Sequence, residues 1–258
     1  MVVLEGWDTA GKGDLVRHLT QRLDPRAFRV HPGTPPSPLE QRHHFLWRYQ
    51  VKLPNDGHIA VFDHSWYGRV LVERVDKLAK KSLWRQAYDE INAFERWLTE
   101  DGQALVKFWL HISKKEQKKR FRACEQDPAM RWKITKEYWR HHKEYKKWVK
   151  AVEEMLAKTD TPNAPWTIVE AEDLRWARVK VFQTLVQRVE QAVAWREANP
   201  TAVARTAAAR AATEAARAQQ AVADAESARA EAKQAGMPLE EPMVARAGNP
   251  RPGKGQGR

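Results

Sequence analysis

The strongest chemical pattern in the sequence lies at its start and is of the phosphate-binding type. Residues 6–13 read GWDTAGKG, follow a short apolar segment and precede a helical pattern, which satisfies the G-x-x-x-x-G-K core of a P-loop in its required context. Glycines let the backbone turn so that successive N–H groups converge, and the helix N-terminus behind them adds partial positive charge. We expect phosphate oxygens to bind at Gly6, Thr9, Ala10, Gly11, Lys12 and Gly13.

Two aspartates are candidates for binding the magnesium ion that usually accompanies such phosphates. The Ser or Thr that normally follows the P-loop lysine is replaced by Gly13, so another side chain must hold the metal. Asp8 lies inside the loop, and Asp63 ends the apolar run 59–62 as the acidic residue of a Walker-B strand does. Mg²⁺ is commonly bound by one or two carboxylates together with substrate oxygens, so we expect Asp8 and Asp63 to share it. Lys12 supplies a mobile positive charge for the terminal phosphates.

The residues around these candidates indicate a parallel sheet covered by helices. Short apolar runs alternate with helical periodicity before residue 199, which is typical of the α/β class. The expected strands are Val2–Leu4, Phe28–His31, Ile59–Phe62, Leu105–His111 and Thr167–Val169. The expected helices are Lys12–Leu23, Leu83–Glu100, Lys114–Glu125, Lys136–Ala157 and Leu174–Ala194. Ser113 followed by Glu116 forms a capping box that fixes the start of the third of these helices.

Length and composition favour one domain followed by a tail. With 258 residues, 42% of them hydrophobic, the chain can bury a single sizeable core. Composition changes at Asn199-Pro200, after which alanine dominates; we therefore expect a domain over residues 1–198 and an Ala/Arg-rich tail, partly helical or disordered, over 199–258. There is no run of eighteen apolar residues and no signal-peptide pattern, from which we expect a cytoplasmic protein without a membrane partner.

Charge restricts the class of partner. The formal net charge of +12 and an isoelectric point near 9.8 favour a polyanion. Charge alone does not choose between nucleic acid, an acidic membrane and a chain of phosphates. No nucleic-acid-binding module is recognisable, so we do not expect nucleic acid as the partner. Cys124 is the single cysteine, which excludes a disulfide framework and a cysteine-rich zinc site.

Four segments, in order along the chain, are similar to a known family. LEGWDTAGKG, FDHSWYGR with VERV after it, KFWLHISKKEQKKRF and APWTIVEAED together resemble the polyphosphate kinase 2 family, and the tryptophan in EGWD resembles its polyphosphate:AMP phosphotransferase branch. The resemblance covers residues 1 to about 195. It implies a P-loop kinase fold of the thymidylate-kinase-like type, with three layers, a parallel sheet and a helical lid. It also implies Mg²⁺-dependent phosphoryl transfer between inorganic polyphosphate and a purine nucleotide, AMP or ADP; we further expect a homo-oligomer.

The resemblance also implies roles for single residues. Asp8 and Asp63 match the metal-binding aspartates of the family, and Lys12 matches its P-loop lysine. Arg69, after the SWYG segment, matches an arginine that contacts the phosphates, and Glu73 falls in a matching position without an assigned role. The phosphate-binding residues expected on the lid are Arg120, Arg122 and Lys133.

Three basic residues of the family pattern are replaced in this sequence. His64 follows Asp63 where the family usually has arginine, so a permanently charged group has become one that is mostly neutral at pH 7. His142 stands where we expect an arginine, and Leu174 where a lysine commonly follows the aspartate of the last strand-to-helix turn. Losing one arginine that stabilises transferring charge could lower the rate on the order of a hundredfold.

Three functions therefore stay open at this point. The first is an active polyphosphate-dependent phosphotransferase, for which Asp8, Lys12, Asp63 and Arg69 are the expected catalytic residues. The second is a polyphosphate-binding module with weakened catalysis, and the third is an ATP-dependent nucleotide kinase of the same fold. A comparison of ATP and polyphosphate as phosphate donors separates the first from the third.

Overall fold

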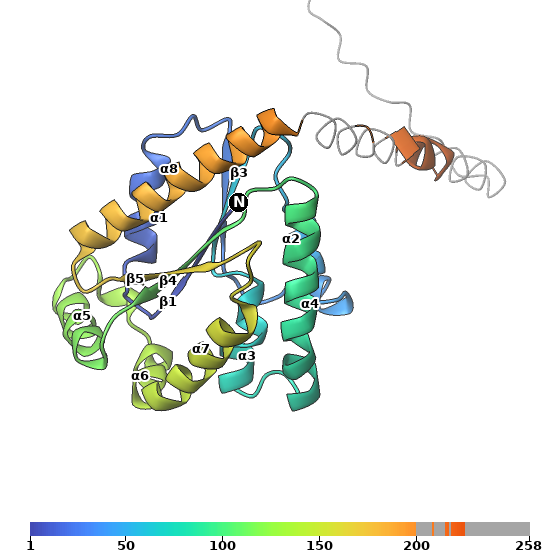
Figure 1. Ribbon diagram of the computed structural model, residues 1–258. Coiled ribbons are helices and arrows are strands. Elements are labelled where there is room, and N and C mark those ends of the chain that lie inside the picture. Colours follow the sequence, from blue (N-terminus) through green and yellow to red (C-terminus); the bar gives the residue numbers. More distant parts are fainter. Residues whose placement is uncertain (200–207, 209–214, 217, 225–258) are drawn as a thin grey trace, which may run out of the picture. The chain divides into compact units, whose positions relative to one another are not determined.

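Figure 1 shows a computed structural model of the protein, in which residues 1–199, 208, 215–216 and 218–224 are described. The chain divides into two units, Met1–Val203 and Ala204–Arg258. The predicted tail lies largely outside the described residues, although 218–224 within it are helical. The expected domain boundary at residue 198 stays a prediction. Across the described residues, no helix combines the length and the apolar character needed to cross a membrane.

The first unit is built on one parallel sheet. Its strands are β1 (Val2–Gly6), β2 (Phe28–Pro32), β3 (Ile59–Asp63), β4 (Val106–His111) and β5 (Trp166–Glu170). Their order across the sheet is β2-β3-β1-β4-β5, and each neighbouring pair is parallel. All carboxyl ends therefore meet at one edge, and the chain passes to opposite sides of β1, which makes this edge the usual place for a ligand. The five predicted strands are confirmed, with ends shifted by at most two residues.

Helices cover both faces of this sheet. They are α1 (Lys12–Thr20), α2 (Trp47–Gln50), α3 (Val72–Val75), α4 (Lys81–Glu100), α5 (Lys114–Gln126), α6 (Lys136–Lys143), α7 (Tyr145–Thr159) and α8 (Leu174–Ala198), with 3-10 turns at Glu40–Arg42, Trp66–Arg69 and Arg131–Lys133. Figure 1 shows α1 and α8 on one face of the sheet and α4 and α7 on the other. The predicted α/β class with a parallel sheet is confirmed. We call residues 114–143, which comprise α5, the last 3-10 turn and α6, the lid segment.

The single helix predicted over Lys136–Ala157 is wrong, because it breaks at Glu144. The backbone there has φ −89° and ψ 14°, and it separates α6 from α7. Tyr145, the next residue, stacks on Trp7 with ring centroids 4.2 Å apart and donates its hydroxyl to the carbonyl of Ile112 at 2.9 Å. These contacts fix the start of α7 against the sheet while α6 follows a separate course. Helical periodicity is the same on both sides of the break, so the sequence carries no sign of it.

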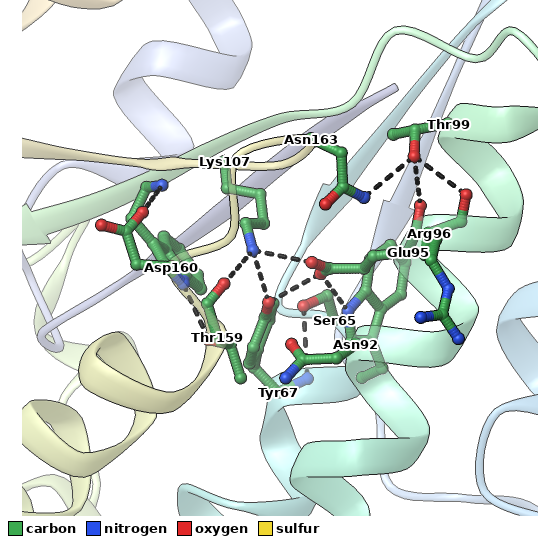
Figure 2. A network of polar contacts seen from close by, with 12 residues as sticks. Ser65, Tyr67, Asn92, Glu95, Arg96, Thr99, Lys107, Thr159, Asp160 and Asn163 are labelled. Carbon is green, nitrogen blue, oxygen red and sulfur yellow. Dashed lines mark hydrogen bonds and ion pairs between the residues drawn. The ribbon is translucent and has the colours of Figure 1, made fainter.

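A buried ion pair connects the sheet to α4 (Figure 2). Lys107 Nζ on β4 lies 2.7 Å from Glu95 Oε2 and also donates to Tyr67 Oη and the carbonyl of Thr159, each at 2.8 Å. The other carboxylate oxygen of Glu95 accepts from Tyr67 Oη at 2.6 Å and from Trp66 Nε1 at 2.9 Å. Burial lowers the pKa of Lys107 and raises the pKa of Glu95, and the contacts within the network oppose both shifts. The network thereby fixes the turn that follows β3.

Candidate active site

The P-loop joins the carboxyl end of β1 to the start of α1. At Gly6, which has φ 150°, an added Cβ would lie 2.6 Å from the carbonyl oxygen of Leu110, so the position accepts only glycine. Gly11, with φ 107°, is the N-cap of α1 and offers no side chain to the first-turn N–H groups, for which an anion is a suitable partner. Lys12 Nζ donates to the carbonyls of Gly6 at 2.9 Å and Trp7 at 3.2 Å. The ammonium therefore lies across the loop at the place expected for phosphate.

The two predicted metal-binding aspartates lie at this same edge. Leu4 of β1 is in register with Asp63 of β3, so Asp63 ends its strand beside the start of the P-loop. Burial raises the pKa of Tyr138 on α6, and the charges of Asp8 and Asp63 raise it further, which places both carboxylates within electrostatic reach of one phenol. Asp63 Oδ1 is buried, and no hydrogen-bond partner for it exists in the described part of the chain. Such an oxygen costs free energy unless a ligand meets it, so this pair fits a divalent cation.

A histidine that the sequence argument did not single out for this site connects Asp8 to the lid segment. His141 Nδ1 lies 3.6 Å from Asp8 Oδ2, and its Nε2 lies 3.1 Å from Asp76 Oδ2. Burial alone would lower the pKa of His141, but the two carboxylates outweigh it and raise that pKa. Arg140 Nη2 lies 2.7 Å from the same oxygen of Asp76. Arg140 and His141 therefore attach α6 to the residue that follows α3, and His141 also attaches it to the P-loop.

The ligand atoms of Asp76, Glu137 and His141 lie within 4.8 Å of one another, which is a spacing that a metal ion could use. Arg140 Nη2, however, lies 2.7 Å from the Asp76 oxygen, 3.6 Å from Glu137 Oε1 and 3.2 Å from His141 Nε2. A guanidinium nitrogen thus already lies within contact distance of all three ligands. We therefore assign this group to an ion-pair network that attaches the lid segment.

Glu5 is a second residue that the sequence argument missed. It is a buried carboxylate near the end of β1, whose Oε1 accepts from the backbone N–H and the hydroxyl of Ser65, both at 2.8 Å. Its Oε2 lies 3.5 Å from Nδ1 of His64, which has a left-handed φ of 64°. Burial would raise the pKa of Glu5, but His64, Ser65 and the charge of Lys12 outweigh it and lower that pKa. Position 64 therefore pairs with a buried carboxylate beside the P-loop lysine.

Arg69 lies on the turn that the buried ion pair fixes. Its Nη1 lies 2.8 Å from Glu73 Oε2, and its guanidinium carbon lies 4.7 Å from the centre of the Phe45 ring. Its Nε is buried, and the described residues offer it no hydrogen-bond partner. The structure thus gives Glu73 a definite contact, as the ion-pair partner that orients Arg69. Contact between Arg69 and phosphate stays a prediction.

Arg120 is tied to the back of the P-loop. Its Nη1 donates to the carbonyl of Thr9 at 3.0 Å, and its Nη2 donates to the carbonyls of Ala171 at 2.7 Å and Glu172 at 2.9 Å. Its Nε donates to Glu116 Oε1 at 2.9 Å. Most of its donors therefore bind protein oxygens and hold the P-loop to the loop between β5 and α8. Phosphate binding by Arg120 stays a prediction that would require some of these contacts to open.

The other two lid residues lie on the surface. Arg122 lines an open hollow on α5 in which basic side chains outnumber acidic ones, together with Ser113, Lys115, Glu116, Lys118, Lys119 and Glu172. Lys133 is exposed, and its ammonium lies 5.5 Å from the centre of the Trp132 ring. Within the described residues, no contact connects Arg122 or Lys133 to Asp8 or Asp63, so their phosphate binding also stays a prediction.

The two remaining replacements differ in their surroundings. His142 is buried, and its Nδ1 lies 2.8 Å from Gln117 Oε1 on α5, where it packs beside Phe121 and Trp139. Leu174, at the start of α8, lies over the P-loop, since a Cβ added at Gly11 would be 2.6 Å from its Cδ2. His142 therefore holds α6 to α5, whereas Leu174 places an apolar group against the loop.

Known proteins are similar to this chain over most of its first unit. The family model described as Polyphosphate kinase 2 matches residues 1–197. A polyphosphate:AMP phosphotransferase of Pseudomonas syringae pv. tomato is 45% identical over 194 residues, which cover 75% of this chain and 39% of that protein. NDP-polyphosphate phosphotransferase 1 of Ruegeria pomeroyi is 36% identical over 73% of this chain and 62% of its own length.

A solved structure is similar as well. The crystal structure of Polyphosphate Kinase 2 from Arthrobacter aurescens TC1 matches with a TM-score of 0.71 and 36% identity, over 74% of this chain and 67% of that one. This chain thus spans less than two thirds of the two relatives named above. The family match nevertheless covers most of the chain, including every strand described and the whole lid segment. The chain belongs to the polyphosphate kinase 2 family.

Proposed function

We propose that this chain transfers a phosphoryl group between inorganic polyphosphate and a purine nucleotide, with AMP or ADP as the acceptor. The observation that carries the proposal is one edge of the sheet, where the P-loop follows β1, Asp63 ends the neighbouring strand β3, and one Asp63 oxygen is buried without a partner among the described residues. The names of the relatives, a polyphosphate:AMP and an NDP-polyphosphate phosphotransferase, support this choice of substrates.

Asp8 and Asp63 would hold Mg²⁺ in this proposal. The ion, when bound, neutralises negative charge on phosphate oxygens and orients them. Both residues carry hard carboxylate oxygens, which suit this ion better than imidazole or thiol ligands do. His141, which belongs to the lid segment, restrains the carboxylate of Asp8.

The remaining groups position the phosphates and compensate their charge. Phosphoryl transfer has a loose transition state with charge spread over several oxygens, so it needs cations and alignment more than a strong base. Lys12 offers a positive charge across the P-loop, and Arg69 offers a guanidinium oriented by Glu73. Glu5, in turn, pairs with Ser65 and His64 and so fixes the segment that follows Asp63.

One assay matrix tests the proposal. Polyphosphate with AMP, polyphosphate with ADP, and ATP with AMP are each incubated with Mg²⁺ or with EDTA, and nucleotide products are separated by chromatography. We expect Mg²⁺-dependent ADP or ATP formation from polyphosphate, and its loss in Lys12→Ala and in Asp63→Asn. Lys150→Ala, exposed on α7, is the matched control and should keep most of the activity. Transfer from ATP but not from polyphosphate would instead support an ATP-dependent kinase, and activity that survives both substitutions would refute the proposal.

His64 motivates a second candidate, a polyphosphate-binding module with weakened catalysis. The imidazole lies at a position where the family resemblance predicts an arginine, and its contact is with Glu5. This candidate predicts salt-sensitive binding of polyphosphate without turnover. Binding by isothermal titration calorimetry together with a blank result in every lane of the assay matrix would favour it over the first.

A further inference from the structure

Trp7 is the single large apolar residue of the P-loop, and its side chain belongs to the interior of the first unit. It is only 5% exposed. The indole stacks on the ring of Tyr145, with centroids 4.2 Å apart and an angle of 14° between the ring planes. It also packs edge-on against Trp109 at 5.9 Å, and its Nε1 donates to Nδ1 of His111 at 3.3 Å. Residues of β4 and the first residue of α7 therefore hold the side chain.

The backbone of Trp7 supports the groups that the proposed reaction uses. Its carbonyl accepts from Lys12 Nζ at 3.2 Å and from the N–H of Ala10 at 3.0 Å. Its N–H donates to the carbonyl of Leu110 on β4 at 3.2 Å. Asp8, a candidate metal ligand, follows Trp7 directly in the chain. A displacement of Trp7 would therefore move the P-loop lysine and this carboxylate together.

The P-loop adopts a conformation that its neighbours must hold. Thr9 has a left-handed φ of 62°. This conformation is rare for a β-branched residue and persists only where the surrounding contacts determine it. On one side of the segment, Arg120 donates to the carbonyl of Thr9 at 3.0 Å. On the other side, the contacts of the Trp7 indole fix the residue that precedes Asp8.

We propose that Trp7 is a positioning residue for phosphoryl transfer, which holds Lys12 and Asp8 in place through its stack on Tyr145. Tyr145 is a suitable anchor, because its hydroxyl donates to the carbonyl of Ile112 at 2.9 Å and the helix that it starts packs into the core. Stacked aromatic rings attract each other beyond the area that they bury. A misplaced charged group slows the chemical step even when the substrate still binds. The inference rests on the proposed phosphoryl transfer, and it concerns alignment: kcat should depend on Trp7, and KM for polyphosphate should not.

Two substitutions at position 7 test the role of the ring. Trp7→Phe keeps an aromatic ring opposite Tyr145 and should retain most of kcat. Trp7→Leu removes the stack and should lower kcat by about tenfold or more, with little change in KM for polyphosphate. Met155→Ala is the control for lost stability, because Met155 is fully buried on α7 about 15 Å along the helix from Tyr145. It should destabilise the protein without changing kcat. Equal losses of kcat in Trp7→Phe and Trp7→Leu, or a change confined to KM, would overturn the proposal.

A double-mutant cycle tests whether Tyr145 is the anchor. Tyr145→Leu should lower kcat as Trp7→Leu does, and the double variant should lose little more than either single variant. Tyr145→Phe keeps the ring, loses only the hydroxyl contact with Ile112, and should keep most of kcat. Urea denaturation of the same proteins gives a measurement that does not depend on activity, since two stacked residues should also lose stability in a non-additive way. Losses of kcat that multiply in the double variant would overturn the role of the stack.

The two proposals fail in different ways in these experiments. An unmodified protein that transfers no phosphoryl group under any condition of the assay matrix would refute the proposed function, and this role of Trp7 with it. An active unmodified protein together with full kcat in Trp7→Leu would refute the role of Trp7 alone.

Discussion

Lys107 and Asp63 lie on two strands of the same sheet, but they differ in how many partners meet their charged atoms. Lys107 is fully buried near the start of β4, and three oxygens accept from its ammonium. Asp63 ends β3 at the opposite edge, and its buried Oδ1 has no partner among the described residues. A buried charge whose hydrogen bonds are all made within the protein belongs to the fold. A buried oxygen without a hydrogen-bond partner is suited to a ligand.

The two regions are connected by one turn. Tyr67 and Trp66 donate to Glu95, the partner of Lys107, and Arg69 ends the same 3-10 turn two residues after Tyr67. The hydrogen-bond network of Lys107 and Glu95 therefore positions Arg69, a cation of the candidate site, although the network itself does not contact that site. Removing a charge from the buried network around Lys107 should change the free energy of unfolding. Removing a charge from the candidate site around Asp63 should change activity.

The largest effect is expected from Lys107→Met, which leaves Glu95 buried without its cation. Breaking a buried pair on one side typically costs about 3–5 kcal/mol, so the free energy of unfolding should fall by that amount. Urea denaturation followed by circular dichroism measures it. Adding Glu95→Gln to the same chain should recover part of the loss, because no buried charge then remains. A loss below about 1 kcal/mol would contradict the assignment of this pair to stability.

Asp63→Asn should show the opposite pattern. We expect kcat/KM with polyphosphate to fall on the order of a hundredfold, since one candidate metal ligand is lost. The free energy of unfolding should stay the same, because Oδ1 loses no protein contact. Steady-state kinetics and urea denaturation on the same preparation measure both. Asp89→Asn, exposed on α4, is the control; a marked loss of stability in Asp63→Asn would mean that the carboxylate serves the fold.

His64→Arg tests whether the site lacks a cation. A guanidinium stays charged at pH 7 and can form two hydrogen bonds to an oxyanion, so we expect kcat to rise about tenfold. His142→Arg is a comparison at a second replaced position, where burial against Gln117 should make the change destabilising without a gain in rate. An unchanged kcat in His64→Arg would show that the imidazole already suffices, or that Glu5 captures the new side chain.

The smallest effect concerns Asp14, a partly exposed charge that joins α1 to α8. Arg178 Nε lies 2.8 Å from Asp14 Oδ2, and Arg17 Nη2 lies 2.8 Å from Oδ1. Burial raises the pKa of Asp14, but the two arginines outweigh it and hold that pKa below 3.8. A carboxyl with a lowered folded pKa adds stability above its unfolded pKa and loses it as pH falls through the folded value. Asp14→Asn should therefore cost roughly 0.5–1 kcal/mol at pH 7, and the gap should close below about pH 4 in urea titrations. A gap that is equal at pH 7 and pH 3 would contradict this assignment.

Much of the scaffold follows from local pattern. Apolar runs predicted all five strands, and the sequence GWDTAGKG predicted the turn between β1 and α1. The cap at Ser113 forms as expected, since its hydroxyl accepts from the N–H of Glu116 at 3.2 Å. The reciprocal contact of the capping box differs, because the N–H of Ser113 donates to Glu172 at 3.3 Å. Local rules thus predicted where this helix starts, but not the tertiary contact that its N-cap residue makes with Glu172.

The contacts around the site were harder to predict because their members are distant in sequence. Asp8, His141 and Asp76 come from three separate segments, and no spacing rule connects them. Glu5 stands inside an apolar strand, where one polar residue gives no sign that it will pair with His64. The family resemblance implied that Arg120 on the lid binds phosphate, and only the tertiary structure reveals the carbonyl groups that accept hydrogen bonds from it.

The break at Glu144 separates two helices that are held to the rest of the fold by different kinds of contact. Tyr145, behind the break, is held by Ile112 and Trp7, whereas α6, ahead of it, meets the P-loop and Asp76 mainly through charged side chains. A chain swings most easily where helical hydrogen bonding is interrupted. Release of a long polyanion would then require charged contacts to separate around a fixed pivot, without repacking the core. The speed of that opening, and with it turnover, should depend on ionic strength.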